Sequence, residues 1–487
     1  MPPSLFTGSG LNKLQRVCIL LLLGGTILYF SGTWRRGYEQ TPSRDAMSEA
    51  SRSMCELYPD TGDIAVIIKT GAQEGLQNLP TTLRTSLSCV QNFSVLSDLN
   101  QTLGDIQIHD VLSRFSRPAM KGNKEFDIYW KQQRLQADGK ESEIPSLSSI
   151  PAIERDWRTK GRTAGWALDK YKWLHMLDMA WDLQPDRDWY LFVETDTYVS
   201  WPNLKRWLQT LESKQKYYLG LAVKKSDDRE PLYFAQGGSG IVLSGALLRE
   251  FAVERRGIAS KYERRMREWW AGDFTLADVL YDELGIHVTQ ILPMVNQHPP
   301  RSIPLSPIAW CQAALAMHHM KADDFDEMFK REHELGFSRL LLRDVYDKIY
   351  PDGLPSESVD WNNIADAHEW AVPIDRNKLP LSVDPNSDFN SCRIACEAHE
   401  DCFSFTWRNT TINLDGPDYN YLHSCVLSGA FRLGAPKPEQ AFWSNTDERD
   451  TYRRWHSGWM RYRISEWAKA HWECDPSQEW ATHAIES

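Results

Sequence analysis

Short apolar runs alternate with helical spacings of apolar residues between residues 60 and 350. Residues 63–70, 93–96 and 189–193 are apolar runs, which are typical of strands buried on both faces of a parallel sheet. The alternation predicts an α/β sheet with buried parallel strands. The helices are expected over residues 79–90, 163–183, 202–211 and 272–284.

Proline-rich and glycine-rich stretches separate these elements. Residues 136–151 are polar with two prolines and residues 293–307 hold five, so we expect loops there. Residues 236–240 read Gln-Gly-Gly-Ser-Gly and precede an apolar strand at 241–243. The alternating pattern fades after about residue 350, which indicates a second unit beyond it.

Residues 17–34 form an uncharged, mostly apolar segment of 18 residues between Arg16 and Arg35. That length is near the minimum for a transmembrane helix. Lys13 and Arg16 precede the segment and favour a cytoplasmic N-terminus. No small-x-small site is evident at residues 30–34, so we expect an uncleaved signal anchor, with a cleaved signal peptide as the alternative. The expected parts are a tail (1–16), a transmembrane helix (17–34) and a stem (35–60).

Composition and charge narrow the class of protein. The chain has 487 residues, of which 42% are hydrophobic and 25% charged, so it can bury a sizeable core. Its net charge of −11 argues against a nucleic-acid-binding protein, which normally presents a basic surface.

Cysteines and glycosylation sequons favour a lumenal compartment. Cys18 lies in the apolar segment, and the other eight cysteines permit four disulfides. Asn92, Asn100 and Asn409 each begin an N-glycosylation sequon on the proposed lumenal side. We therefore expect a single-pass type II protein of the Golgi or endoplasmic reticulum membrane.

The second unit carries closely spaced cysteines. In Cys392-x3-Cys396 both sulfurs lie on one helical face, which suits a disulfide scaffold better than a zinc site. Residues 391–407, SCRIACEAHEDCFSFTW, resemble the PAN/apple module. That resemblance implies the pairs Cys392–Cys425 and Cys396–Cys402 in a small α+β module at 360–465, followed by a tail at 466–487.

The other four cysteines are expected to form two further pairs, and the role of the module has two alternatives. Cys55 and Cys89 flank the first strand and are expected to pair, which leaves Cys311–Cys474 by elimination. The module either binds a carbohydrate or protein, or is a disulfide-linked extension with no binding role.

An acidic motif follows the apolar run at 189–193. Glu194 and Asp196 are separated by one residue, so in an extended chain both side chains point to the same side. Ligands of open α/β sheets bind beyond the carboxyl ends of strands. The two carboxylates are therefore candidates for a divalent cation that also binds a diphosphate. The alternative is an acidic turn.

Four longer runs together resemble glycosyltransferase family 31, closest to its core 1 β-1,3-galactosyltransferase and fringe branches. The resemblance covers about residues 60–335 and implies a GT-A fold for residues 61–350. Its combination with a PAN-like module is similar to a fungal-type subgroup. The runs are DKYKWLHMLDMAW, DWYLFVETDTYVSWPNLKRWL, YYLGLAV and FAQGGSGIVLSGALLREF.

The resemblance implies a metal site with one departure. Family members usually read Asp-Asp-Asp where this chain has Glu194-Thr195-Asp196, so Asp196 is the expected metal ligand, with help from Glu194. Residues 314–320, ALAMHHM, resemble the segment that ends in a metal-binding histidine, here His318. Mixed Asp and His ligation favours Mn²⁺. The alternative is a histidine pair without a metal.

The same resemblance implies a catalytic base and donor contacts. Residues 269–276, WWAGDFTL, resemble the stretch that places an acidic residue near the acceptor, which makes Asp273 the expected base. Asp273 also stands where a helix N-cap is expected. Arg84 has the alternative of a surface position on its helix. The implied nucleotide-sugar contacts are Thr70, Arg84, Asp98, Glu194, Thr195, Asp196, Gly237 and Gly238.

The sequence therefore predicts an inverting, metal-dependent glycosyltransferase. It would transfer a hexose, expected to be galactose, from a UDP-sugar to a glycan or glycoprotein hydroxyl. A homodimer is compatible with the sequence, and no nucleic-acid partner is expected. The alternative is a non-catalytic lumenal lectin or a folding partner of an active transferase, favoured by the imperfect acidic triplet.

Overall fold

The structure is a computed structural model that describes residues 55–154, 156–224, 232–367, 370–413, 419–441 and 451–480. Every described residue belongs to one compact unit, Ser53–Ser487. The predicted cytoplasmic tail, transmembrane segment and most of the stem lie outside the described residues. Among those that are described, no helix has the length and apolar character needed to cross a membrane.

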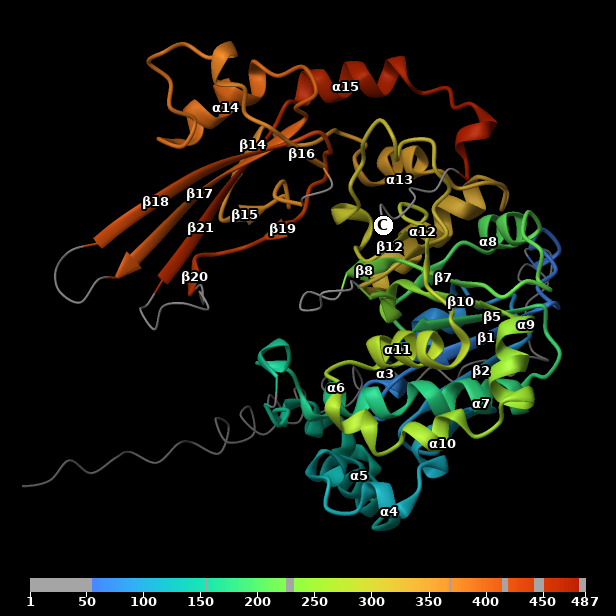
Figure 1. The fold of residues 1–487 in the computed structure, drawn as a ribbon. Helices are drawn as coiled ribbons and strands as arrows, with labels where there is room; N and C mark the ends of the chain where they lie inside the picture. The colour runs from blue at the N-terminus through green and yellow to red at the C-terminus, as the bar shows by residue number, and fades with distance from the viewer. Residues whose placement is uncertain are drawn as a thin grey trace, which may run out of the picture. The chain divides into compact units, whose positions relative to one another are not determined.

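An eight-stranded mixed sheet forms the centre of the first part (Figure 1). Its order is β11-β7-β10-β5-β1-β2-β4-β3. The predicted apolar strands are confirmed, and β5, β1, β2 and β4 run parallel, whereas β10 lies antiparallel to β5. The bounds are β1 Ile64–Lys69, β2 Phe93–Ser97, β3 Gln101–Leu103, β4 Ile106–Asp110, β5 Trp189–Glu194, β7 Tyr218–Gly220, β10 Ile241–Ser244 and β11 Thr289–Gln290.

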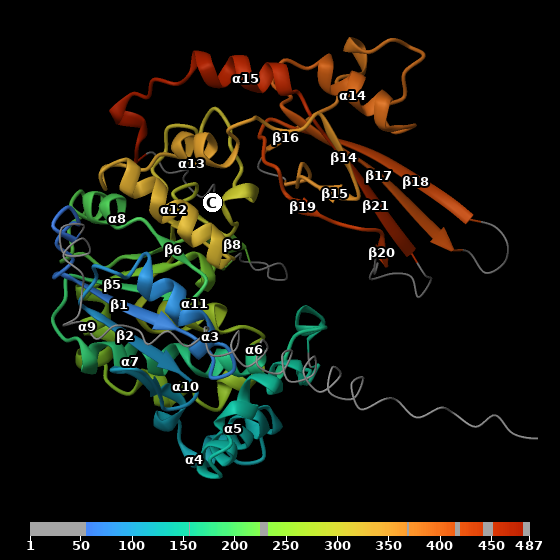
Figure 2. The same cartoon turned by 180° about the vertical axis from the view of Figure 1, so that it is seen from behind.

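Both faces of this sheet are covered by apolar side chains. Alternate residues of β1 enter two different cores, with Ala65 and Ile67 in one and Val66 and Ile68 in the other. Every residue of β1 is buried, as expected for a central strand between two helical layers. α7 and α11 contribute to the first core, and α3 and α8 to the second (Figure 2).

The helices that flank the site differ in part from the sequence prediction. α11 spans Gly272–Leu284 as predicted, and α8 spans Trp201–Leu208. α3 spans Gly75–Arg84 rather than 79–90, because the Thr- and Ser-rich residues that follow are poor helix formers. The predicted helix at 163–183 is interrupted, giving α6 (Ala164–Leu168), a 3-10 turn (Asp169–Tyr171) and α7 (Trp173–Leu183).

A small three-stranded sheet adjoins the end of β5. Its strands are β12 (Val295–Asn296), β13 (Ala316–Met317) and β6 (Tyr198–Val199). Met317 pairs with Tyr198, and the backbone N–H of Met320 donates to the carbonyl oxygen of Asp196 at 3.0 Å. This sheet therefore holds the two histidines after β13 beside the acidic motif after β5.

The C-terminal part is built on long antiparallel strands (Figure 1). α14 (Phe389–Glu397) packs on this sheet in a small apolar core. The sheet order is β14-β21-β17-β18-β16, with β20 paired to β21. The bounds are β14 Glu357–Val359, β16 Ala371–Val372, β17 Ser404–Asn413, β18 Tyr419–Ser428, β20 Gln440–Ala441 and β21 Thr451–Trp459, with β15 (Trp361–Asn362) paired to β19 (Ala435–Pro436).

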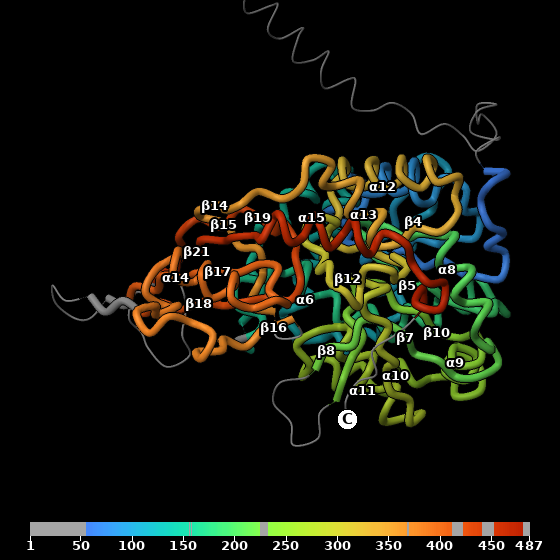
Figure 3. The backbone as a smooth tube through the Cα atoms, turned by 90° about the horizontal axis from the view of Figure 1, so that it is seen from above, coloured from blue at the N-terminus to red at the C-terminus, as the bar shows by residue number. Residues whose placement is uncertain are grey.

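The C-terminal part shares a core with the end of the first part. Trp310 and Phe325 pack in one cluster with Phe431, Trp459 and Ile464. α15 (Arg461–Ala470) lies near α13 (Leu342–Ile349) in Figure 3. Residues of both helices line one hollow. The two parts therefore depend on each other for burial of apolar surface.

The four disulfides of the structure join the pairs expected from the sequence. They are Cys55–Cys89, Cys311–Cys474, Cys392–Cys425 and Cys396–Cys402. The remaining helices and strands are α4 Arg117–Met120, α5 Asp127–Ala137, β8 Ala222–Lys224, β9 Tyr233–Ala235, α9 Gly245–Arg249, α10 Ile258–Tyr262 and α12 Ala322–Glu334.

Candidate active site

Charged residues meet where β1 and β5 end side by side. Lys69 and Glu194 are paired in the parallel register, and Lys69 Nζ lies 3.0 Å from Glu194 Oε1. Asp169, in the turn before α7, places Oδ2 2.7 Å from the same Nζ. Burial alone would lower the pKa of Lys69, but the two carboxylates raise it above its usual value, so this lysine stays charged.

A second lysine brings the predicted donor contacts Thr70 and Asp98 together. Lys172 Nζ donates to the carbonyl oxygen of Thr70 at 2.9 Å and lies 3.0 Å from Asp169 Oδ1. The same Nζ is 3.9 Å from Asp98 Oδ1, which accepts a hydrogen bond from the N–H of Ala72 at 2.9 Å. Two buried cations thus line the end of the central strands, where a diphosphate would need positive charge.

Asp196, His318 and His319 form a group that could hold a metal ion. His318 Nε2 is 3.3 Å from Asp196 Oδ1, and His319 Nδ1 is 3.6 Å from Asp196 Oδ2. His318 is buried, whereas the side chain of His319 is 64% exposed and that of Asp196 is 34% exposed, so solvent reaches the group from one side. One carboxylate and two imidazoles are a donor set that fits a divalent transition-metal ion such as Mn²⁺.

The two neighbouring histidines favour the ionised form of Asp196. Burial would raise the pKa of Asp196, but its hydrogen bonds to His318 and His319 lower it below the usual range. The hydrogen bond to Asp196 raises the pKa of His319. Asp196 is therefore ionised at neutral pH, as a metal ligand requires.

The predicted metal ligand Glu194 lies beside this group but not within it. Its Oε2 is 4.0 Å from His318 Nε2, while its Oε1 is held by Lys69. Thr195 is buried, and its carbonyl oxygen accepts a hydrogen bond from Thr82 Oγ1 at 2.8 Å. The two residues that depart from the family pattern are thus engaged by neighbours on α3 and β1.

The glycine-rich loop lies against the buried histidine. A Cβ on Gly238 would come within 2.0 Å of His318 Cε1, so only glycine fits at this position. The carbonyl oxygen of Gly238 accepts a hydrogen bond from Thr197 Oγ1 at 2.7 Å. A Cβ on Gly237 would meet Trp173 at 2.8 Å. Gly237 and Gly238 were predicted as contacts of the nucleotide sugar, and the close approaches in the structure are to the rings of Trp173 and His318.

Asp273 connects α11 to the glycine-rich loop. Its Oδ2 accepts a hydrogen bond from the N–H of Gly237 at 3.1 Å, and its Oδ1 accepts one from the N–H of Phe274 at 2.8 Å. Burial raises the pKa of Asp273 to about 6, although these two N–H groups oppose the rise. A carboxylate with a pKa near 6 can accept a proton at neutral pH.

The expectation that Asp273 is a helix N-cap is wrong. The N-cap of α11 is Ala271, and Asp273 lies in the first turn of the helix. Its carboxylate bonds the loop N–H of Gly237, so its structural role is to join two elements. The tertiary contact, which local sequence cannot reveal, replaces the expected cap.

Arg84 takes the alternative that the sequence left open, an exposed position on its helix. It ends α3, about 15 Å along the helix from the turn after β1. Its guanidinium makes an exposed ion pair with Asp326 of α12, with Nη2 3.0 Å from Oδ2. The structure thus does not bring Arg84 together with Thr70 and Asp98.

The three predicted N-glycosylation sites differ in exposure. Asn100 is exposed, and its Oδ1 accepts a hydrogen bond from the N–H of Asp110 at 2.9 Å. Asn92 is half-buried, with Nδ2 3.4 Å from the carbonyl oxygen of Gly62. Asn409 is half-buried in the central strand β17, between β18 and β21.

Several residues of the site were not among those predicted as ligands or contacts. Asp169 and Lys172 lie in the run DKYK, and the signal available was the presence of charges in an otherwise apolar helical segment. His319 was not expected as a ligand, because the register of the resemblance places the metal-binding histidine at His318. Glu74 precedes α3. Burial raises its pKa, and the negative charges of Glu194 and Asp196 act in the same direction.

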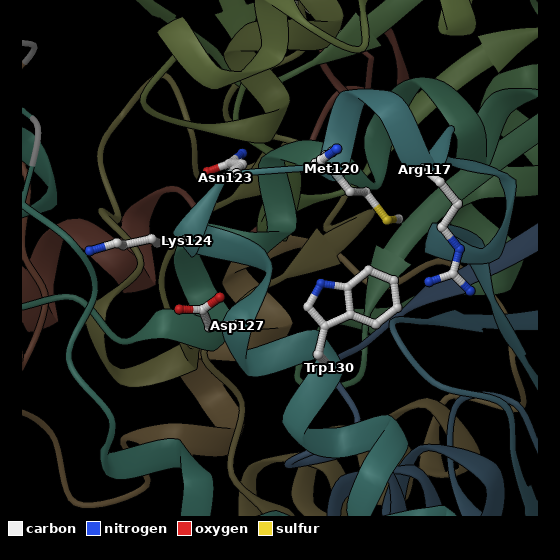
Figure 4. A pocket seen from close by; sticks show the side chains of 8 residues that line it. Arg117, Met120, Asn123, Lys124, Asp127 and Trp130 are labelled. Atoms are coloured by element: carbon white, nitrogen blue, oxygen red, sulfur yellow. The ribbon is translucent and has the colours of Figure 1, made fainter.

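A separate hollow of about 270 Å³ lies on α4 and α5 (Figure 4). The guanidinium of Arg117 stands 4.5 Å from the centre of the Trp130 ring, and Lys124 and Asp127 lie on the other side. The residues that line it include none of those predicted for catalysis or donor binding. The hollow is therefore separate from the candidate site at the strand ends.

The site is a cluster of acidic residues and histidines, with basic residues beside it. It lies at the ends of the central strands of a mixed α/β sheet. Residues 155–329 match the family model described as Fringe-like. A Fringe-like domain implies a glycosyltransferase of the family 31 type, and Fringe-like glycosyltransferases use UDP-sugar donors. The matched segment contains Asp169, Asp196, the glycine-rich loop, Asp273 and both histidines. No curated protein matches the chain.

Proposed function

We propose that this protein is an inverting, Mn²⁺-dependent hexosyltransferase that moves a hexose, galactose in the first instance, from a UDP-sugar to a glycan or glycoprotein hydroxyl. The observation that carries the proposal is the group of Asp196, His318 and His319 at the end of β5, within the segment that matches the Fringe-like family. A metal site in that position suits a nucleoside diphosphate donor.

The donor side of the reaction is assigned to the strand ends. Asp196 and His318 would hold Mn²⁺, which when bound supplies positive charge to the departing UDP. Lys69 and Lys172 keep two further positive charges beside the phosphates. Thr70 and Asp98 are the proposed contacts of the nucleoside, and Gly237 and Gly238 hold the shape of the loop between donor and acceptor.

The acceptor side is assigned to Asp273. An inverting displacement needs one base to take the proton of the attacking hydroxyl as the bond from C1 to phosphate breaks. The carboxylate of Asp273 is half-buried, its raised pKa is close to neutrality, and its position is fixed by Gly237. In this proposal the proton moves from the acceptor oxygen to Asp273 while UDP leaves.

The setting of the enzyme is part of the proposal. Residues 17–34 would anchor it in the Golgi or endoplasmic reticulum membrane with the catalytic part in the lumen, which agrees with four disulfides. The helix-on-sheet arrangement of α14 and β17, with its two disulfides, supports a PAN/apple-like module at 360–465. A homodimer would be compatible with this setting.

One observation favours a second candidate function. Glu194 is paired with Lys69 and Thr195 has no carboxylate, so Asp196 is the one carboxylate of the triplet that faces the two histidines. A protein altered in this way would serve as a lumenal lectin or as a folding partner of an active transferase. It would bind a glycan or a transferase without hydrolysing UDP-sugars.

A donor screen separates the two functions. The full chain is incubated with a panel of UDP-sugars, with and without Mn²⁺, and released UDP is measured. A transferase hydrolyses one donor slowly without acceptor and only with the metal, and the sugar product has the inverted anomeric configuration. Absence of turnover with every donor, together with glycan binding, would favour the lectin.

A further inference from the structure

The side chains of His318 and His319 point in the same direction although the residues are adjacent. Neighbouring residues of an extended chain normally point to opposite sides. His319 has φ 58°, a left-handed conformation that residues with a Cβ rarely adopt. As a result the two imidazole rings stack, with centroids 3.8 Å apart and planes 24° from parallel. Both rings therefore place one nitrogen close to a carboxylate oxygen of Asp196.

The left-handed residue is held by contacts on both sides. The N–H of His318 donates to the carbonyl oxygen of Asn296 at 3.1 Å, and the N–H of Met320 donates to that of Asp196 at 3.0 Å. Unfavourable backbone conformations of this kind persist where surrounding structure imposes them, and they cluster at functional sites. The exposed side chain of His319 fills no core that would explain the conformation.

The carboxylate of Glu194 makes an ion pair with Lys69 instead of joining the two histidines. Its Oε1 pairs with the buried Lys69 at 3.0 Å, and its Oε2 stays 4.0 Å from His318 Nε2. Leaving Lys69 would remove one of the two carboxylates that neutralise a buried cation, which is costly. The departure from aspartate to glutamate at this position thus coincides with an ion pair to β1.

We propose that His319, and not Glu194, completes the protein part of the metal site, so that Asp196, His318 and His319 are its three ligands. Ligand atoms at about 2.0 to 2.2 Å from one ion lie about 3 to 4 Å from each other. His318 Nε2 lies 3.3 Å from Asp196 Oδ1 and His319 Nδ1 lies 3.6 Å from Asp196 Oδ2, both in this range, and one donor atom from each of the three residues lies within 4.8 Å of the others. The inference rests on the proposed metal-dependent function for its role, but metal binding can be measured without any sugar donor.

Two imidazoles change which ions the site prefers. Nitrogen ligands favour the later first-row ions, whereas Mg²⁺ prefers oxygen ligands and water. The site should therefore bind Co²⁺ more tightly than Mn²⁺, and Mg²⁺ more weakly than either. Removal of His319 should lower the preference of Mn²⁺ over Mg²⁺ as well as the affinity for Mn²⁺.

The test counts the nitrogens bound to Mn²⁺ alone in the purified full chain. Pulsed electron paramagnetic resonance detects the ¹⁴N of coordinated imidazoles, and a titration gives the affinity. Wild type should show two nitrogens. His319→Gly, which suits the positive φ, should show one nitrogen and an Mn²⁺ affinity lower by about tenfold or more. His319→Ala should give the same result, which separates loss of the imidazole from a change in backbone.

The matched control is Glu194→Gln, which keeps the shape of the side chain and removes its charge. It should retain both nitrogens and lose less affinity than either His319 variant. Unchanged nitrogen counts in both His319 variants, one nitrogen in wild type, or a larger loss in Glu194→Gln would each overturn the proposal.

The outcomes distinguish this inference from the proposed function. A wild-type chain that binds no Mn²⁺ contradicts both. Binding through a single nitrogen overturns the role of His319 and leaves metal-dependent transfer standing. Binding through two nitrogens without turnover of any UDP-sugar supports the role of His319 and contradicts the transferase.

Discussion

At the scale of single residues, the site depends on close contacts that tolerate little change. Gly238 leaves no room for a Cβ beside His318, and Asp273 uses both carboxylate oxygens to bind N–H groups. Asp196 stands between two imidazoles. These contacts give separable predictions for metal binding and for proton transfer.

Gly238→Ala should disturb the metal site without unfolding the protein. Its Cβ would approach His318 Cε1 to 2.0 Å, so the ring must move away from Asp196. We expect the Mn²⁺ affinity to fall by about tenfold or more, as for loss of ligand orientation. Gly71→Ala is the matched control, because its Cβ would meet its nearest neighbour at 3.7 Å. Equal affinities in the two variants, measured by titration calorimetry, would refute the role of Gly238.

Asp273→Asn should lower turnover by about 10²- to 10⁴-fold with little change in UDP affinity, because a base is needed only in the transition state. The amide oxygen can still accept the N–H of Gly237, but the amide NH2 cannot accept the N–H of Phe274, so the thermal midpoint should fall while the chain stays folded. Initial rates and UDP binding are measured on one preparation. Full activity in this variant would return Asp273 to a structural role.

The pH profile tests the same residue independently. Burial raises the pKa of Asp273 to about 6, and only its ionised form can accept a proton. kcat/KM should therefore rise with pH up to about 6 and level off above it, falling about tenfold per pH unit on the acid side. The residual rate of Asp273→Asn should lack this acid limb. An acid limb that persists in the variant would assign it to another group.

At the scale of elements, the strands could be predicted from the sequence and the helix boundaries only in part. β1, β2 and β5 are buried on both faces and therefore stand out as apolar runs. The interruption between α6 and α7 was not predicted, and Asp169, which lies in it, pairs with Lys69, 100 residues earlier in the chain. The same holds for the antiparallel direction of β10.

The site was predictable to a similar extent. Asp196 and His318 follow strands and carry a recognisable motif, so their types and positions were informative. His319 was not, because its left-handed backbone is held by contacts of its neighbours with Asn296 and Asp196, which lie in other parts of the chain. Arg84 has the charge of a phosphate contact, but the direction of α3 carries it to an exposed surface.

The junction of β1, β5 and the turn before α7 gives a stability prediction. Lys69→Met would leave Asp169 with only Lys172 and would leave Glu194 without its cation. Because removal of one partner leaves buried charges unpaired, we expect a loss of about 3 kcal/mol in the free energy of unfolding. Lys205→Met, which removes a more exposed ion pair with Asp63, is the control. Equal losses in urea titrations would contradict the importance of this junction.

At the scale of the whole molecule, the C-terminal part supports the catalytic part. Phe431, Trp459 and Ile464 bury the same core as Trp310, and Trp310 Nε1 donates to the carbonyl oxygen of His471 at 2.8 Å. Arg432 also lies close enough to His298 to help burial lower the pKa of that histidine to about 4, and His318 and His319 contribute to the same shift. The C-terminal part thus reaches the neighbourhood of the metal group.

A chain that ends at residue 354 should therefore fail to give a stable, active enzyme. It would expose the shared core and lose the Cys311–Cys474 disulfide, which closes 163 residues and stabilises by about 2 to 4 kcal/mol in typical cases. Cys474→Ser, which removes only the disulfide, should lower the thermal midpoint but keep activity. A truncated chain with normal activity and cooperative unfolding would contradict this dependence.

Metal-dependent transfer is tested most directly by the release of UDP from the best UDP-hexose by wild type and Asp196→Asn, titrated with Mn²⁺. The substitution keeps the size of a half-exposed side chain at a strand end, so the fold should persist. We expect Mn²⁺-dependent release in wild type and a loss of at least about 10²-fold in the variant, with circular dichroism unchanged. Equal rates in the two proteins, or release in wild type that does not depend on the metal, would contradict it.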